Sequence, residues 1–216
     1  MHFMRYRLLL LISLLVTIAS ISFGQERVGS THDKGVSING VTWSRCNVGA
    51  FGTFAAAPED FGMLYQWNRE TVWLSYGNDP VSSPPGAAWD SSKAAGSTWN
   101  TANDPCPRGW RVPTKSEQAT LLDSHNVANE WVVLNNVKGC RFTDRTSGLS
   151  IFLPAAGARR CDDGTLCLID GYAGVYWSTG SNSVDYAWTL SIYKDLVEQT
   201  DDYKRSHGHT VRCVRR

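Results

Sequence analysis

The clearest pattern along the chain is the alternation of bulky apolar and small polar residues from Tyr186 to Tyr193. Such alternation is typical of a half-buried antiparallel strand. Near the other end, residues 36–38 and 41–43 flank Asn39-Gly40, a dipeptide that favours a tight hairpin turn because both residues tolerate positive φ. Further strands are expected at 110–112, 131–134, 150–153, 175–178 and 210–214, and the aromatic segments 61–67 and 71–76 are expected to be strands or packed loops.

One helix is predicted from its N-terminal residues. Thr114 stands three residues before Glu117 and just ahead of an apolar run at 119–122, which is the signature of a capping box. The helix is expected near 115–124, with Glu117 bonding backbone donors rather than acting as a catalytic carboxylate. One helix among many short antiparallel strands and long loops indicates the α+β class.

The segment 77–105 is rich in Gly, Pro, Ser, Asn and Asp and contains Trp89 and Trp99. It is long for a structureless connection within a compact domain. We therefore expect the two tryptophans to hold it against the body of the protein.

The N-terminus has the pattern of a secretory signal peptide. Arg5 and Arg7 precede an apolar run over 8–21, and small residues follow at Ser22 and Gly24. The run is shorter than the roughly 20 residues of a permanent membrane anchor, although an uncleaved N-terminal membrane helix is the alternative.

The signal peptide is assigned to residues 1–24, a flexible polar segment to 25–35 and a single domain to 36–216. The expected location is outside the cytoplasm: secreted, periplasmic or at the cell surface, with no transmembrane anchor after cleavage. Hydrophobic residues at 42% and charged residues at 19% exclude an intrinsically disordered chain. The formal net charge of +1, which falls when Arg5 and Arg7 leave with the leader, argues against nucleic-acid binding.

Six cysteines follow the export signal, and an even count in an exported chain favours disulfides. Two of them flank the turn-forming stretch 162–165, and another two lie beside the most strand-like segments. The expected pairs are Cys161–Cys167, Cys106–Cys213 and, by elimination, Cys46–Cys140. A zinc site is the alternative, but the chain has no CxxC motif and the spacings are irregular, so neither a metal nor a cofactor is predicted.

A set of short motifs runs through the domain in a fixed order. They are Val41-Thr42-Trp43, Asn47-Val48-Gly49-Ala50, the segment 61–68, the segment 103–114, Phe152-Leu153-Pro154-Ala155-Ala156-Gly157, Tyr176-Trp177-Ser178-Thr179 and Val211-Arg212-Cys213-Val214. In this order they resemble the Fibrobacter succinogenes major paralogous domain family, and the resemblance covers roughly residues 36 to 215. It implies an exported or surface protein of a kind abundant in Bacteroidetes, in a family whose biochemical role is largely undefined.

A more distant resemblance is to the C-type lectin-like fold of formylglycine-generating enzymes. It is carried by the run 111–114 with Glu117 and by the closing run 211–213. It implies that the N- and C-terminal strands lie together and that Cys106 with Cys213 closes the fold. The Gly-Gly-Ser-Trp run of those enzymes is missing, as are the tripeptides of calcium-dependent lectins, so neither activity is implied.

Two groups of side chains remain as candidates for chemistry. His207 and His209 share one face of an extended segment and are candidate metal ligands, but no third ligand is evident and solvated surface is the simpler interpretation. Paired acidic residues such as 162–163 and 201–202 are explained by turns and edge protection.

Most of the nine tryptophans are expected in the core. If a ligand-binding patch exists, we expect it after residue 174, with Tyr193, Asp201, Tyr203 and His207 as candidates. The predicted function is a non-catalytic binding or structural module of the bacterial cell surface, whose partner is an extracellular glycan or a cell-envelope protein. The alternative is an exported enzyme related to formylglycine-generating enzymes, which a free reactive thiol at position 46 or 140 would favour.

Overall fold

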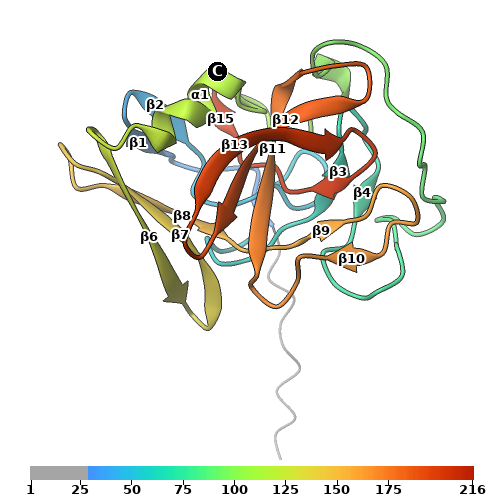
Figure 1. Ribbon diagram of the computed structural model, residues 1–216, viewed down its shortest axis with the longest axis horizontal. Helices are drawn as coiled ribbons and strands as arrows, with labels where there is room; N and C mark the ends of the chain where they lie inside the picture. The colour runs from blue at the N-terminus through green and yellow to red at the C-terminus, as the bar shows by residue number, and fades with distance from the viewer. Residues whose placement is uncertain (1–28) are drawn as a thin grey trace, which may run out of the picture.

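The computed structural model describes residues 29–216, apart from the side chains of residues 201 and 202. The signal peptide predicted over 1–24 lies outside the described residues. In the part of the chain that the structure describes, no helix is long and apolar enough to cross a membrane. Mostly antiparallel strands with one short α-helix form an α+β domain (Figure 1).

The two ends of the domain meet in one four-stranded sheet. Its order is β1 (Val36–Ile38), β2 (Val41–Trp43), β15 (Val214–Arg215) and β5 (Trp110–Arg111). The predicted Asn39-Gly40 turn joins β1 to β2, with φ of 45° and 78°. Trp43 of β2 is the register partner of Val214 of β15, so the N- and C-terminal strands lie side by side.

The second sheet has five very short strands. Its order is β10 (Leu166–Cys167), β9 (Ala158–Arg159), β14 (Gly208–His209), β3 (Leu64–Gln66) and β4 (Val72–Trp73). The predicted aromatic segments 61–67 and 71–76 therefore contain strands, but only over their central residues.

Two three-stranded meanders complete the fold. One consists of β6 (Val127–Leu134), β7 (Val137–Asp144) and β8 (Ser150–Pro154), and the other of β11 (Ala173–Ser181), β12 (Tyr186–Tyr193) and β13 (Val197–Lys204). The β6–β7 hairpin projects from the body of the protein (Figure 1). The sequence does not predict strands β7 and β13, and β13 contains the candidate patch residues Asp201 and Tyr203.

The predicted capping box is present at the start of α1 (Lys115–Ala119). The Thr114 hydroxyl accepts a hydrogen bond from the backbone N–H of Glu117, and the Glu117 carboxylate accepts one from the backbone N–H of Thr114 over 2.8 Å. Glu117 also pairs with Arg111. The helix is shorter than expected, because it continues only as the 3₁₀ turn η2 (Thr120–Leu122). A second 3₁₀ turn, η1 (Thr101–Asn103), lies in the long loop.

The tryptophans of the long loop hold it in place, as the sequence predicts. Trp89 packs on Trp73 with ring centroids 4.8 Å apart, and Trp99 packs on Trp67 at 5.9 Å. Six of the nine tryptophans are buried; they are Trp43, Trp67, Trp73, Trp99, Trp110 and Trp177. The aromatic content therefore mainly builds the core.

Three buried arginines hold loops by donating to backbone carbonyls rather than by pairing with carboxylates. Arg159 donates to the carbonyl oxygens of four residues in loop 74–78 and to that of Gly164. Arg205 donates hydrogen bonds to the backbone carbonyls of residues 94 and 96, and Arg212 donates to acceptors in the segment 44–47. Because each guanidinium presents five N–H donors, one side chain satisfies several carbonyls that would otherwise be buried unbonded.

The segment expected to be flexible over 25–35 is docked from Ser30 onward. Ser30 and Phe54 exchange backbone hydrogen bonds of 3.1 and 2.7 Å. The carboxylate of Asp33 accepts from the backbone N–H groups of Gly35 and Arg45, each over 2.7 Å. These hydrogen bonds hold the segment against the body of the domain, and its polar sequence alone does not reveal this docking.

Candidate functional site

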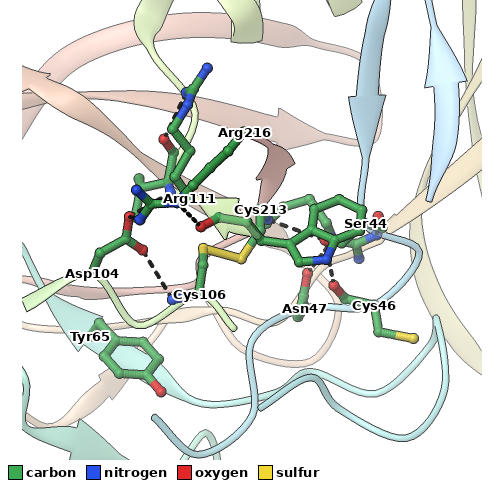
Figure 2. Close-up of a disulfide and its surroundings, with 12 residues drawn as sticks. Ser44, Cys46, Asn47, Tyr65, Asp104, Cys106, Arg111, Cys213 and Arg216 are labelled. Atoms are coloured by element: carbon green, nitrogen blue, oxygen red, sulfur yellow. Dashed lines mark hydrogen bonds and ion pairs between the residues drawn. A yellow bond between two sulfur atoms is a disulfide. The ribbon is translucent and has the colours of Figure 1, made fainter. Parts of the chain in front are cut away.

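A single disulfide links the described cysteines. Cys106 and Cys213 are bonded, with their Cα atoms 6.0 Å apart (Figure 2). The other two expected pairs are not formed, and Cys46, Cys140, Cys161 and Cys167 carry free thiols.

The packing separates Cys46 from Cys140, and the hairpin register does not place Cys161 opposite Cys167. Cys46 packs against the hydrophobic cluster around the disulfide, whereas Cys140 belongs to the second cluster. Figure 2 shows the Cys46 sulfur pointing away from the disulfide. In the β9–β10 hairpin the partner of Cys167 is Ala158 and not Cys161.

Burial raises the pKa of three of the four free thiols. Burial raises the pKa of Cys46, although Arg212 opposes this effect, and burial raises the pKa of Cys140 to about 12. Burial also raises the pKa of Cys167. A catalytic cysteine needs its pKa lowered so that the thiolate is populated near neutral pH.

An exposed apolar groove lies where the tip of the β6–β7 hairpin, loop 168–172 and the β12–β13 turn meet. It encloses about 1320 Å³. The residues that line it are Trp131, Val133, Lys138, Leu168, Ile169, Asp170, Gly171, Tyr172, Tyr193, Lys194, Asp195, Leu196 and Glu198.

This groove collects much of the apolar surface of the protein. Of the nine large hydrophobic side chains exposed within residues 29–216, Val133, Ile169, Tyr172 and Leu196 line it, with exposed fractions of 46% to 63%. Exposed hydrophobic side chains scattered singly are normal, whereas these four gather in one groove.

The wall formed by β6 follows from the turn at Asn135-Asn136. Both residues have positive φ, 48° and 67°, as in the tight turns that match strand twist. The register places Trp131 opposite Cys140 and Val133 opposite Lys138. Since side chains alternate along a strand, Trp131 and Val133 share one face: Trp131 packs on the core, and Val133 extends beyond it into the groove.

Loop 168–172 forms the second wall and is closely packed. Leu168 and Asp170 have positive φ, 54° and 62°, which is uncommon for residues other than glycine. A Cβ added to Gly171 would come 2.8 Å from Cδ of Lys138, so the loop backbone lies directly on that side chain. The loop thereby presents Tyr172 to solvent beside the hairpin tip.

An aromatic row leads from the groove toward the core. The ring of Tyr172 meets that of Tyr193 edge to face at 5.9 Å, and the hydroxyl of Tyr193 lies 3.3 Å from that of Tyr203. Tyr203 in turn contacts His207 at 5.4 Å and His209 at 4.6 Å between ring centroids. The structure thus brings together three of the four candidate patch residues, while the side chain of the fourth, Asp201, is not described.

The two histidines do not form an evident metal centre. Among residues 29–216, no group of three or more His, Cys, Asp or Glu side chains is arranged to hold a metal ion. His207 Nδ1 lies 3.1 Å from the carbonyl oxygen of Lys204. His209 is fully buried against Trp177 and Tyr203, with ring centroids 4.4 and 4.6 Å away.

A second hollow, lined by polar residues, lies beside the long loop and is less suited to a ligand. It is bordered by residues 68–71 and 93–103. Its polar groups already bond one another: Asn68 Oδ1 accepts from the backbone N–H of Asn100, and Asn103 Nδ2 donates to the carbonyl of Asn68. These bonds hold the long loop against Asn68.

The sequence identifies only one member of the apolar groove, Tyr193. The exposed residues that define it come from segments far apart in the chain, so no local spacing reveals them. One local feature of the sequence could have indicated the hairpin that forms one wall of the groove. It is the pair Asn135-Asn136, whose tolerance of positive φ predicts a hairpin turn there. Comparison of the chain with protein-family models, curated proteins and solved structures found no match.

Proposed function

We propose that this chain is an exported, non-catalytic binding module of the bacterial cell surface, whose contact surface is the groove around Tyr172. In this proposal the domain has the C-type lectin-like fold of the Fibrobacter succinogenes major paralogous domain family. The order of the sequence motifs supports this assignment. The adjacency of the terminal strands and the Cys106–Cys213 bond, both implied by the resemblance, also support it.

The observation that carries the binding function is the clustering of exposed apolar side chains in one groove. Tyr172 and Leu196 are exposed to water, so the fold does not gain the stabilisation that burial of their apolar surface would bring. Aromatic anchors within an apolar patch, surrounded by charged residues, are the usual composition of a contact surface. The expected ligand is an extracellular glycan or a cell-envelope protein.

The second candidate is an exported enzyme related to formylglycine-generating enzymes. The free state of Cys46 and Cys140 favours it, because such an enzyme works through thiols. The direction of their pKa shifts opposes it, since burial raises both. The binding function therefore has the stronger physical support.

The chain itself offers a matched control for testing the groove. Three exposed side chains elsewhere have the same residue types, and their exposed fractions of 52% to 66% are close to those in the groove. The groove variant is Val133→Ser, Tyr172→Ser and Leu196→Ser, and the control variant is Val184→Ser, Tyr76→Ser and Leu149→Ser.

Residues 25–216 and both variants are screened against a glycan array and against envelope proteins of the producing organism. We expect the groove variant to lose at least about tenfold in affinity for the ligand that the wild type binds, because hot-spot side chains dominate contact energy. The control variant should keep wild-type affinity, and circular dichroism should show both variants folded. Equal binding by wild type and groove variant would place the contact surface elsewhere.

A further inference from the structure

We infer that the groove receives an extended segment of a partner protein, which pairs as an antiparallel strand with the free edge of β6. This inference names the partner class for the proposed binding function and rests on it. It is carried by the unpaired backbone of β6 and by the position of the apolar groove along the same edge.

The register of the hairpin determines which backbone groups of β6 face outward. In a hairpin with a two-residue turn, the residues flanking the turn exchange both of their hydrogen bonds, and the pairs alternate from there. Leu134 and Val137 flank the turn, so the even-numbered residues of β6 bond β7. Asn129, Trp131 and Val133 then present N–H and C=O groups to the free edge.

Two observed bonds agree with this alternation. The N–H of Val127, which the alternation directs away from β7, donates to the carbonyl of Asp123 over 2.8 Å. The carbonyl of Lys138, the partner of Val133, accepts from the N–H of Ala155 on the far side of β7 over 2.9 Å. Both bonds point as the alternation requires.

The edge of β6 lacks the features that usually block strand addition. Among the described residues, no backbone group outside β7 bonds the segment 128–134. The segment contains no proline, its pairing with β7 is continuous, and the charge of Glu130 is paired with Arg141. Proteins normally protect exposed edges with proline, bulges, unpaired charges or a covering element.

The edge of β13, in contrast, is protected. Its pairing with β12 is interrupted by a register shift near Thr189, and Gln199 donates its side-chain amide to the carbonyl of Lys115 in α1. The β6 edge is therefore the more open site for an added strand.

The groove lies on the same face as the side chains of the outward-facing residues. A residue paired directly with Trp131 or Val133 would place its side chain on that face, next to Tyr172 and Leu196. Because side chains repeat every second residue, the partner segment needs apolar residues at alternating positions.

The aliphatic part of the lining favours a peptide over a saccharide. Val133, Leu168, Ile169 and Leu196 offer no hydrogen-bonding side chains, so sugar hydroxyls buried against them would go unbonded at a free-energy cost. The charged residues in the lining are three carboxylates, from Asp170, Asp195 and Glu198, and two lysines. With three carboxylates against two lysines the lining is net negative, so a basic residue in the partner complements this surface.

A peptide probe tests strand addition directly. The probe is acetyl-Lys-Val-Thr-Val-Thr-Val-Lys-amide, with one isomer N-methylated at the central valine and another at the following threonine. In antiparallel pairing the valines facing the groove also direct their N–H groups to β6, and the threonine N–H groups point away. We expect methylation of the valine to weaken binding about tenfold or more, and methylation of the threonine to change it by less than about threefold.

A substitution in β6 supplies the complementary test. Val133→Pro removes one outward N–H at an edge position that tolerates proline, and Val133→Ala shortens the same side chain but keeps the N–H. We expect the proline variant to bind the unmethylated probe at least about tenfold more weakly than the alanine variant. Thermal unfolding of both variants verifies that the hairpin persists.

Each contrary outcome overturns the inference in a recognisable way. Equal affinity of the two methylated isomers, or of the two Val133 variants, shows that the backbone of β6 is not used. If sedimentation shows that the wild type is a dimer and that Val133→Pro is a monomer, the edge of β6 pairs with a second copy of this chain instead. A last outcome is that the wild type and the matched control variant bind a glycan, the groove variant does not, and none of the proteins binds the peptides. That result refutes strand addition and leaves the proposed function standing.

Discussion

The imidazole rings of His207 and His209 lie almost parallel, with 9° between their planes and 5.5 Å between their centroids. His209 is fully buried, and neither of its ring nitrogens has a hydrogen-bond partner among the described residues. Burial, reinforced by the neighbouring His207, holds the pKa of His209 well below its usual value, and burial also lowers the pKa of His207. The fold therefore stabilises the neutral form of both rings.

This arrangement predicts that the protein loses stability in mild acid. The unfolded state takes up protons on both histidines near pH 6.5, while the folded state takes them up only at lower pH. Stability is thus fully present above about pH 6.5 and falls below it, by up to about 1.4 kcal/mol per pH unit for each proton. Urea unfolding between pH 7.5 and 5 measures the slope.

Two variants assign this slope to the buried ring. His209→Phe should reduce the slope of stability against pH. The replacement loses no hydrogen bond, because the ring nitrogens of His209 make none with the described residues. His125→Phe, at an exposed position, should retain the wild-type slope. The same slope in His209→Phe as in the wild type would contradict the assignment.

The Cys106–Cys213 bond should contribute a large share of the stability. It closes a loop with a sequence separation of 107 residues, and a cross-link of this length restricts the unfolded chain strongly. We expect Cys106→Ala with Cys213→Ala to lower the free energy of unfolding by about 2–5 kcal/mol, measured by urea titration. Dithiothreitol should lower the stability of the wild type to that of the variant and leave the variant unchanged. A wild type insensitive to reduction would refute this role.

The remaining cysteines give a prediction that separates the structure from the sequence-based expectation. The structure predicts four free thiols per chain in denaturant without reductant, whereas three disulfides would leave none. In the native state Cys140 should react slowest with a thiol reagent at pH 8, because burial raises its pKa to about 12 and keeps it protonated. A count with Ellman's reagent, before and after unfolding, measures both numbers.

Local chemistry made parts of this fold predictable. The turn at Asn39-Gly40 and the capping box of Thr114 and Glu117 depend on residues adjacent in sequence, and both are present. Strand β7 was missed because Gly139 and charged residues obscure the alternation that places Cys140 and Phe142 in the core. Nothing local could reveal that the tip of this hairpin would meet loop 168–172.

Long-range packing also overrides alternation at the C-terminus. Val211 and Cys213 point inward, as the period of two predicts, and the same period would place Arg212 in solvent. Arg212 is instead buried, because the segment 44–47 and β8 cover the other face. The sequence shows the arginine but not the acceptors that surround it.

Arg212 therefore supplies the last prediction, a severe loss of stability when its guanidinium is removed. Its Nε donates to Asn47 Oδ1 over 2.9 Å, and its other nitrogens donate to the carbonyls of Ser44, Arg45 and Phe152 at 2.7 to 3.1 Å. In Arg212→Met the buried acceptors among them, Asn47 Oδ1 and the carbonyls of Ser44 and Phe152, lose their donors, and each costs about 1–3 kcal/mol if left unsatisfied. We expect a loss above about 3 kcal/mol in urea unfolding.

Conservative and surface variants sharpen this test. Arg212→Lys keeps the charge but cannot reproduce the planar set of donors, so it should fall between the methionine variant and the wild type. Arg108→Met, at an exposed position, should change the free energy of unfolding by less than about 0.5 kcal/mol. If Arg212→Met were as stable as Arg108→Met, the buried guanidinium would not be what holds the segment 44–47 against β8.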